Sequence, residues 1–121
     1  MLRCLIIDDS ASFLDAASSM LERQGLEVVG VALSGAEALR QVEALRPDVA
    51  LVDVSLGPES GLDLARRLSA SGFEGTVILI STRAEADFGD LIAKTPAAGF
   101  VPKSELSGAA VERLVSGSRD M

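Results

Sequence analysis

The sequence contains little of several residue types on which other classes of protein depend. Cys4 is the only cysteine, so no internal disulfide can form, and its place in an apolar run favours a buried strand residue over a reactive thiol. Trp and Tyr are absent, and the four aromatic side chains are all Phe. We therefore expect an aliphatic core and, from the cysteine usage, a cytoplasmic protein.

Basic residues are also few. The chain has 11 Lys and Arg against 18 Asp and Glu, which gives a net charge of −7. Nucleic acids and anionic membranes are bound by clustered Lys and Arg, so neither is an expected direct partner. No apolar run approaches the roughly 20 residues that span a bilayer. The run Leu2–Ile7 is also too short for the core of a signal peptide.

Short, β-rich apolar segments alternate with longer segments of helical periodicity. The predicted strands are Leu2–Ile7, Glu27–Ala32, Val49–Val52, Thr76–Ile80 and Ala98–Val101. The predicted helices are Ser10–Gln24, Ser34–Leu45, Gly61–Ala70, Ala84–Lys94 and Ser104–Val115. Ser34 and Glu37 form a capping box, and Pro47 ends that helix. Gly89 weakens the fourth helix, since Gly costs about 1 kcal/mol relative to Ala.

This order predicts a (βα)5 fold. Strands that are apolar throughout belong to a parallel sheet covered on both faces. Right-handed crossovers then give a three-layer α/β sandwich with strand order 2-1-3-4-5, which is flavodoxin-like. Phe13 is expected to face the core from the first helix. We expect residues 1–121 to form a single domain, with 116–121 as a frayed tail.

Polar side chains follow four of the predicted strands at their carboxyl ends, where open parallel sheets bind ligands. They are Asp8 and Asp9 after the first strand, Asp53 after the third, Ser81 and Thr82 after the fourth, and Lys103 after the fifth. Three neighbouring carboxylates repel one another, and oxygen ligands without His or Cys favour a hard cation such as Mg²⁺. A carboxylate nucleophile beside a metal and an ammonium is an arrangement for phosphoryl transfer.

Each of these residues alone has an ordinary explanation. Asp9 or Ser10 could cap the first helix, Asp53 could be a loop residue, and Lys103 could be a solvated lysine. The combination at four strand ends is what predicts a site.

The same positions resemble the receiver domain of two-component response regulators, over essentially the whole chain. Four segments carry the resemblance: residues 5–10 (LIIDDS) with the acidic pair, 51–61 (LVDVSLGPESG) with the phospho-acceptor, 78–81 (ILIS) with the switch hydroxyl, and 99–103 (GFVPK) with the switch aromatic and the lysine. The resemblance implies a signalling module with a chemotaxis-regulator-like fold, which catalyses only its own phosphorylation and dephosphorylation.

The resemblance also implies residue roles. Asp53 would accept the phosphoryl group. Asp9 would ligate Mg²⁺ directly and Asp8 largely through water, with Asp53 and the backbone carbonyl of Ser55 as further ligands.

The remaining roles concern the switch. Ser81 would hydrogen-bond the phosphoryl group, Lys103 would pair with Asp53 or a phosphoryl oxygen, and Phe100 would move between outward and inward positions. The donor would be a sensor histidine kinase or a histidine phosphotransfer protein. The output surface would comprise the fourth predicted helix, the fifth strand and the fifth helix. It would engage a downstream protein target or an effector domain, with a phosphorylation-dependent homodimer as a further option.

Three departures from the usual family pattern affect the site. Gly57-Pro58 replaces the usual loop sequence, so the loop is expected to be shaped differently. Thr82 stands where a very small residue is common. It would either narrow access to Asp53 or offer a second candidate for the switch hydroxyl, for which Ser81 is favoured because the apolar run ends just before it. Ser104 follows Lys103 where Pro is common, so the usual cis bond to Pro is absent.

Alternative functions stay open at this point. The chain could be a stand-alone regulator or the receiver part of a longer DNA-binding regulator. It could also be a scaffold that works without phosphorylation. A haloacid-dehalogenase-like Mg²⁺ phosphatase would carry Asp-x-Asp after the first strand, whereas this chain has Asp8-Asp9-Ser10, with Ser10 in the place of the second acid.

Overall fold

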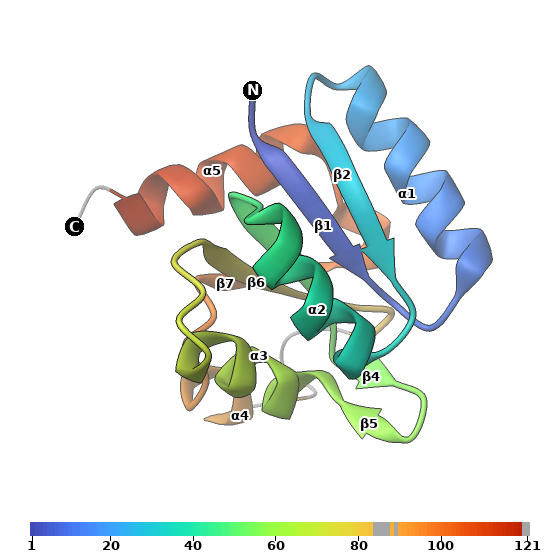
Figure 1. Ribbon diagram of the computed structural model, residues 1–121. Helices are drawn as coiled ribbons and strands as arrows, with labels where there is room; N and C mark the ends of the chain where they lie inside the picture. Colours follow the sequence, from blue (N-terminus) through green and yellow to red (C-terminus); the bar gives the residue numbers. More distant parts are fainter. Residues whose placement is uncertain (84–87, 89, 120–121) are drawn as a thin grey trace.

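The computed structural model describes residues 1–83, 88 and 90–119, and it contains a five-stranded parallel sheet (Figure 1). The strands are β1 (Arg3–Ile7), β2 (Glu27–Ala32), β3 (Val49–Asp53), β6 (Thr76–Ser81) and β7 (Gly99–Pro102). Their order in the sheet is β2-β1-β3-β6-β7, and every pairing is parallel. Since β6 and β7 are the fourth and fifth predicted strands, this order confirms the flavodoxin-like prediction.

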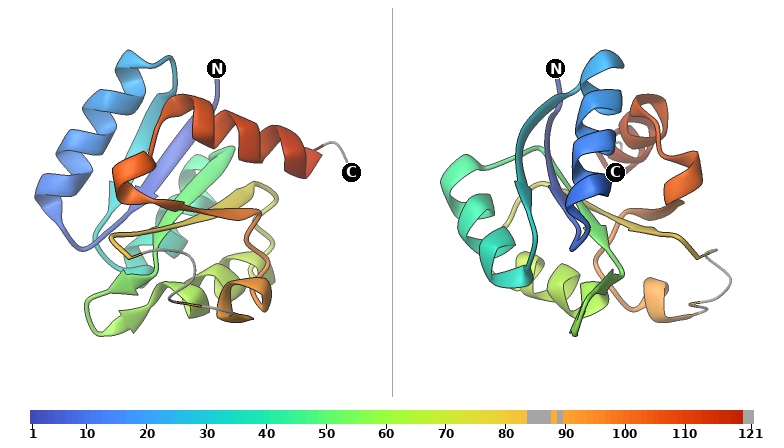
Figure 2. Two further views of the ribbon diagram at one scale, coloured as in Figure 1. Left: turned by 180° about the vertical axis from the view of Figure 1, so that it is seen from behind. Right: turned by 90° about the vertical axis from the view of Figure 1, so that its right-hand side faces the viewer.

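Helices cover both faces of the sheet and make three layers (Figure 2). They are α1 (Ala11–Arg23), α2 (Gly35–Leu45), α3 (Gly61–Ala70), α4 (Asp90–Ala93) and α5 (Gly108–Arg119). Side chains of α1 and α5 pack on one face and those of α2 and α3 on the other, so two aliphatic clusters flank the sheet. Among the described helices, none has the length and apolar character needed to cross a membrane.

Serine side chains fix the amino ends of the first three helices. The Oγ atoms of Ser10, Ser34 and Ser60 each accept a hydrogen bond from the backbone N–H three residues later, at 3.3 Å. These bonds satisfy donors that a helix leaves unpaired at its first turn. The predicted start of α2 at Ser34 is thereby confirmed. At its other end, Arg46 is left-handed with φ 48°, just before Pro47.

The predicted helix Ser104–Val115 is wrong at its start. Lys103–Glu105 instead form a short 3₁₀ helix, η2, and α5 begins at Gly108. The Oγ of Ser107, not of Ser104, accepts a hydrogen bond from the helix, from Ala110 N at 3.0 Å. Gly108 N also donates to Gln24 Oε1 at 2.6 Å, which anchors this end of α5 to the end of α1.

Two further predictions concern the weak helix and the tail. Of the predicted helix Ala84–Lys94, residues 84–87 and 89 lie outside the described residues, and α4 comprises Asp90–Ala93. The tail was expected to fray from residue 116, but α5 continues to Arg119. Residues 120 and 121 lie outside the described part of the chain.

A small hairpin that the sequence did not predict follows β3. It consists of β4 (Ser55–Leu56) and β5 (Glu59–Ser60), joined by Gly57 and Pro58. Gly57 has φ 60°, while the ring of Pro58 holds its own φ negative. A positive φ followed by a negative one is the sign pattern of a type II′ turn, whose twist matches that of paired strands. The unusual Gly57-Pro58 sequence thus forms a tight turn beside the acidic residues.

Gly61 allows α3 to begin against the loop that follows β3. Its N–H donates to Val54 O at 2.8 Å, and a Cβ at this position would overlap the Asp53 carbonyl group and lie 2.8 Å from Val54 Cα. Backbone atoms cannot yield as a flexible side chain can. Only glycine therefore permits this approach, which fixes the backbone next to Asp53.

We predict that Gly61→Ala lowers the free energy of unfolding by about 1–3 kcal/mol, because the added methyl group forces the two backbone segments apart. Urea denaturation followed by circular dichroism would measure the change. Gly117→Ala in α5 is the matched control. Apart from its chain neighbours and the backbone of its own helix, no described atom lies within 4 Å of its added Cβ. The substitution should therefore raise stability by about 0.5–1 kcal/mol. Equal effects of the two substitutions would contradict the packing argument.

Candidate functional site

The polar residues predicted from the strand ends lie together at the carboxyl edge of the sheet. Asp8 directly follows β1, Asp53 ends β3, and Ser81 ends β6. Lys103 directly follows β7. The register pairs Asp53 with Ile80, and Ser81 with Pro102. Parallel pairing thus brings residues from distant parts of the chain to one edge, as expected for this architecture.

Three carboxylates form a compact group at this edge. One oxygen from each of Asp8, Asp9 and Asp53 lies within 4.8 Å of the other two. Asp8 is fully buried and Asp53 is 5% exposed, whereas Asp9 is exposed. Two charges are thus largely removed from water, which is costly unless a positive charge compensates them.

Lys103, directly after the fifth strand, supplies that compensation. Its Nζ lies 3.2 Å from Asp53 Oδ2, to which it donates a hydrogen bond. It also lies 2.6 Å from Asp8 Oδ2, with which it forms an ion pair. The side chain of Lys103 is only 14% exposed. One ammonium thus bridges the carboxylates that follow β1 and end β3.

Backbone amides orient the same side chains. Ser10 N donates to Asp8 Oδ1 at 2.9 Å, and Ser55 N donates to Asp53 Oδ1 at 3.0 Å. Arg83 N donates to Ser81 Oγ at 3.0 Å, and Ser81 is 2% exposed. Ser10, which stands where a dehalogenase-like phosphatase would have its second acid, caps α1 with its hydroxyl.

The protonation of two groups reflects this environment. Burial raises the pKa of Asp53, and the charge of Asp8 raises it further, although the Ser55 N–H and Lys103 oppose them. Burial alone would lower the pKa of Lys103, but its short contact with Asp8 and the charges of Asp53 and Asp8 raise it on balance. Lys103 therefore carries its positive charge at neutral pH.

The carboxylate group fits a hard divalent cation. Among the described residues, the polar contact of the buried Asp8 Oδ2 is its ion pair with Lys103. A carboxylate oxygen has two lone pairs, so this atom can still accept a further ligand. The three grouped donor atoms are all carboxylate oxygens, which Mg²⁺ prefers as ligands. Gly57 brings the turn of the hairpin to this point, since its added Cβ would lie 3.4 Å from Asp9 Oδ2.

Phe100 and Thr82, also singled out from the sequence, lie near this edge. Phe100 is half-buried on β7 and packs with Phe88, the ring centroids being 5.6 Å apart at 49°. In the sheet it pairs with Leu79, two residues before Ser81. Thr82 is exposed just after β6. Lys103 and Ser104 are joined by a trans bond, as is every described pair.

One contact at the site was missed by sequence reasoning. The Phe13 ring packs against the core as predicted, but Lys103 Nζ also lies over it, 4.3 Å from its centroid. A possible sequence signal was the aromatic residue three positions after the helix-capping Ser10, in the first turn after the acidic pair.

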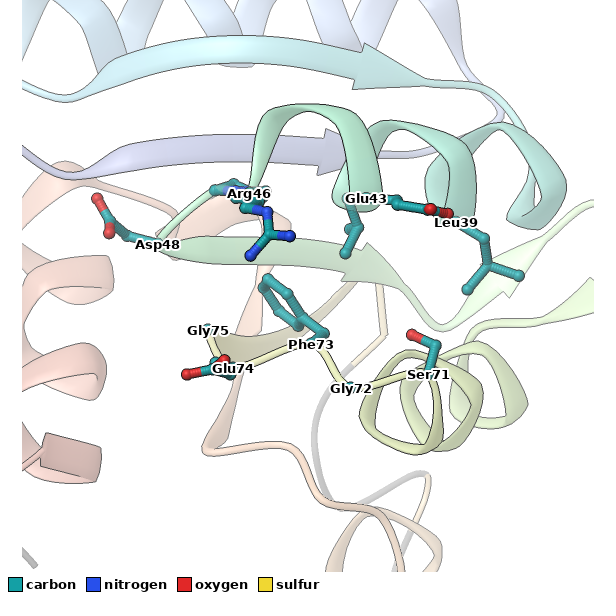
Figure 3. Close-up of a pocket in the computed structure, with 11 residues that line it drawn as sticks. Leu39, Glu43, Arg46, Asp48, Ser71, Gly72, Phe73, Glu74 and Gly75 are labelled. Carbon is teal, nitrogen blue, oxygen red and sulfur yellow. The ribbon is translucent and has the colours of Figure 1, made fainter.

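A separate hollow lies at the opposite, amino end of the sheet (Figure 3). Its volume is about 790 Å³, and it lies between the end of α2 and the loop from α3 to β6. Arg46 and Phe73 face each other across it. No predicted site residue lines this hollow, so it is distinct from the acidic group.

Comparison with known proteins agrees with this geometry. Residues 4–114 match the family described as "Response regulator receiver domain". The chain is 33% identical to the response regulator GacA of Pseudomonas viridiflava over 98% of its length. It is 32% identical to the uncharacterized transcriptional regulatory protein YvfU of Bacillus subtilis, again over 98% of its length. It spans only 54% and 62% of those two relatives.

Solved structures agree as well. The signal receiver domain of NarL from Mycobacterium tuberculosis is 30% identical and superimposes with a TM-score of 0.81, covering 93% of this chain and 95% of that one. A CheY-like receiver domain protein from Methanospirillum hungatei shares the fold, with a TM-score of 0.80 at 22% identity over 100% of this chain and 99% of that one. The chain therefore belongs to the response regulator receiver domain family of two-component signal transduction.

Proposed function

We propose that Asp53 accepts a phosphoryl group in a Mg²⁺-dependent reaction. The observation that carries this proposal is the position of Asp53 Oδ2, at the carboxyl edge of the sheet and 3.2 Å from Lys103 Nζ, with oxygens of Asp8 and Asp9 within 4.8 Å of one of its own. A nucleophilic carboxylate, a cation site and an ammonium then surround the same point in space. This is the set of groups that phosphoryl transfer requires.

Asp8, Asp9, Asp53 and the backbone carbonyl of Ser55 would hold the metal ion. When bound, Mg²⁺ would neutralise charge on the phosphoryl oxygens and orient them. The convergence of one oxygen from each of Asp8, Asp9 and Asp53 within 4.8 Å supports this assignment. Asp9 is the most exposed member of the group. It would therefore be the carboxylate that an arriving ion meets first.

The transfer itself would proceed in line. One oxygen of the Asp53 carboxylate forms the new bond to phosphorus. The bond between phosphorus and the imidazole nitrogen of a phosphohistidine breaks, and that nitrogen keeps the electron pair. Lys103 Nζ would move from Asp53 Oδ2 to a phosphoryl oxygen as negative charge develops there. The Ser81 hydroxyl would donate a hydrogen bond to another phosphoryl oxygen. The donor would be a sensor histidine kinase or a histidine phosphotransfer protein.

The output would be a change at the surface formed by α4, β7 and α5. Phosphorylation adds nearly two negative charges at the site. If Ser81 turns toward them, its hydrogen bond from Arg83 N is lost, and Phe100 on the adjacent strand can repack. The partner at this surface would be a downstream protein target, a second copy of the chain or an effector domain. Because the relatives are about twice as long, a receiver within a longer regulator is compatible with this proposal.

We predict that incubation with acetyl phosphate and Mg²⁺ adds one phosphoryl group to the chain and that Asp53→Asn abolishes the addition. The amide is a far weaker nucleophile but has nearly the same shape, so the fold should persist. Intact mass spectrometry would measure the product. Omission of Mg²⁺ should also prevent it.

Two results would count against the proposal. Modification of Asp53→Asn to the same extent as the wild type would place the acceptor elsewhere. No modification by acetyl phosphate or by a phosphorylated histidine phosphotransfer protein, with Thr82→Ala included to widen access, would favour the phosphorylation-independent scaffold.

A second prediction concerns the metal. Asp9→Asn should weaken Mg²⁺ binding about tenfold or more, because affinity depends on the number of charged ligands. Calorimetric titration suits this measurement, since the chain has no Trp or Tyr to report it by fluorescence. Asp63→Asn is the matched control, because it removes the same charge from an exposed ion pair with Arg66. Equal weakening by both substitutions would show that Mg²⁺ responds only to net charge.

A further inference from the structure

The third side of the Lys103 ammonium is occupied by an aromatic ring. Its Nζ contacts Asp8 and Asp53 at 2.6 and 3.2 Å and lies over the Phe13 ring at 4.3 Å from the centroid. One carboxylate directly follows β1, the other ends β3, and the ring belongs to helix α1. The ammonium is therefore held between groups from three elements, and only 14% of the Lys103 side chain is exposed.

The loop that supplies Asp8 also fixes Phe13. Ser10 N donates to Asp8 Oδ1, and Ser10 Oγ accepts from Phe13 N. One residue thus connects the buried carboxylate to the backbone of the aromatic residue. The half-buried ring also packs against the core cluster of α1 and α5, which restricts its rotation. The ring position is consequently set by the same structure that sets the acidic group.

A ring face acts on an ammonium differently from a carboxylate. It attracts the cation through its quadrupole, without adding negative charge to a site that already has three carboxylates. The attraction also lacks the strict direction of a hydrogen bond. An ammonium above the ring can therefore turn from Asp53 Oδ2 toward a phosphoryl oxygen while it keeps the aromatic contact.

We propose that Phe13 is a positioning residue for Lys103, holding the ammonium at the acidic edge through a cation–π contact. This inference rests on the proposed role of Lys103 in phosphoryl transfer. Phe13 touches no reacting atom and acts through the lysine. Loss of the ring face would let water and alternative rotamers compete for the ammonium, which should slow phosphorylation of Asp53.

The test compares Phe13→Leu with Phe13→Tyr. Leucine keeps apolar bulk without a ring face, and tyrosine keeps the face. Phosphorylation by acetyl phosphate at saturating Mg²⁺ should be about 3- to 10-fold slower in Phe13→Leu and close to wild type in Phe13→Tyr. Phe73→Leu makes the same change at the opposite end of the sheet and should leave the rate unchanged.

A spectroscopic measurement detects the contact between Lys103 and Phe13 without requiring phosphorylation. Lys94 and Lys103 are the only lysines in the sequence, so lysine labelled with ¹³C at the ε carbon gives two methylene signals. Protons above a ring face resonate upfield, so the ε-methylene of Lys103 should be shifted upfield of that of exposed Lys94. The shift should vanish in Phe13→Leu and persist in Phe13→Tyr and Phe73→Leu.

The two readouts separate the possible failures. An upfield Lys103 signal with no phosphorylation of the wild type would overturn the proposed function but leave the contact in place. Absence of the upfield shift in the wild type would overturn the contact itself. Equal rate losses in Phe13→Leu and Phe13→Tyr would assign Phe13 a packing role only, and an unchanged rate in Phe13→Leu would remove its positioning role.

Discussion

The bridge from Lys103 to Asp8 and Asp53 connects three strands that are far apart in the sequence. Without it, two buried carboxylates would face each other with no compensating charge, and the cost of removing them from water would oppose the fold. The bridge also requires that the ends of β1, β3 and β7 meet at one edge. The charges of the site are therefore compensated only when the strands pair in this parallel register.

Most of the architecture was predictable because its signals are periodic and local. The strands of the sheet are continuous apolar runs, and Asp8, Asp53, Ser81 and Lys103 directly follow or end four of them. Parallel pairing alone then brings these residues together. The family resemblance assigns roles to the same residues, but their placement followed from the strand ends and the strand order alone.

The features that sequence reasoning missed either depend on contacts between distant residues or are too short to show a periodic pattern. Ser104 and Ser107 are equally good helix caps in isolation, and the contact of Gly108 with Gln24, 84 residues away, accompanies the later start. The β4–β5 hairpin has strands of two residues, too short for any periodicity. Phe13 fits the apolar periodicity of its helix as a core residue, so the pattern gives no sign of its second contact, with Lys103.

The hairpin beside Asp9 is also attached to a helix on its other side. Glu59 in β5 accepts a hydrogen bond from Gly35 N at 3.1 Å, at the first residue of α2 and 24 positions earlier in the chain. An acidic side chain at this end of a helix also interacts favourably with the helix dipole. A shift of the hairpin would therefore expose the Gly35 amide to water. The hydrogen-exchange rate of the Gly35 amide therefore reports movement of the hairpin that borders the acidic group, and no probe has to be placed in the site itself.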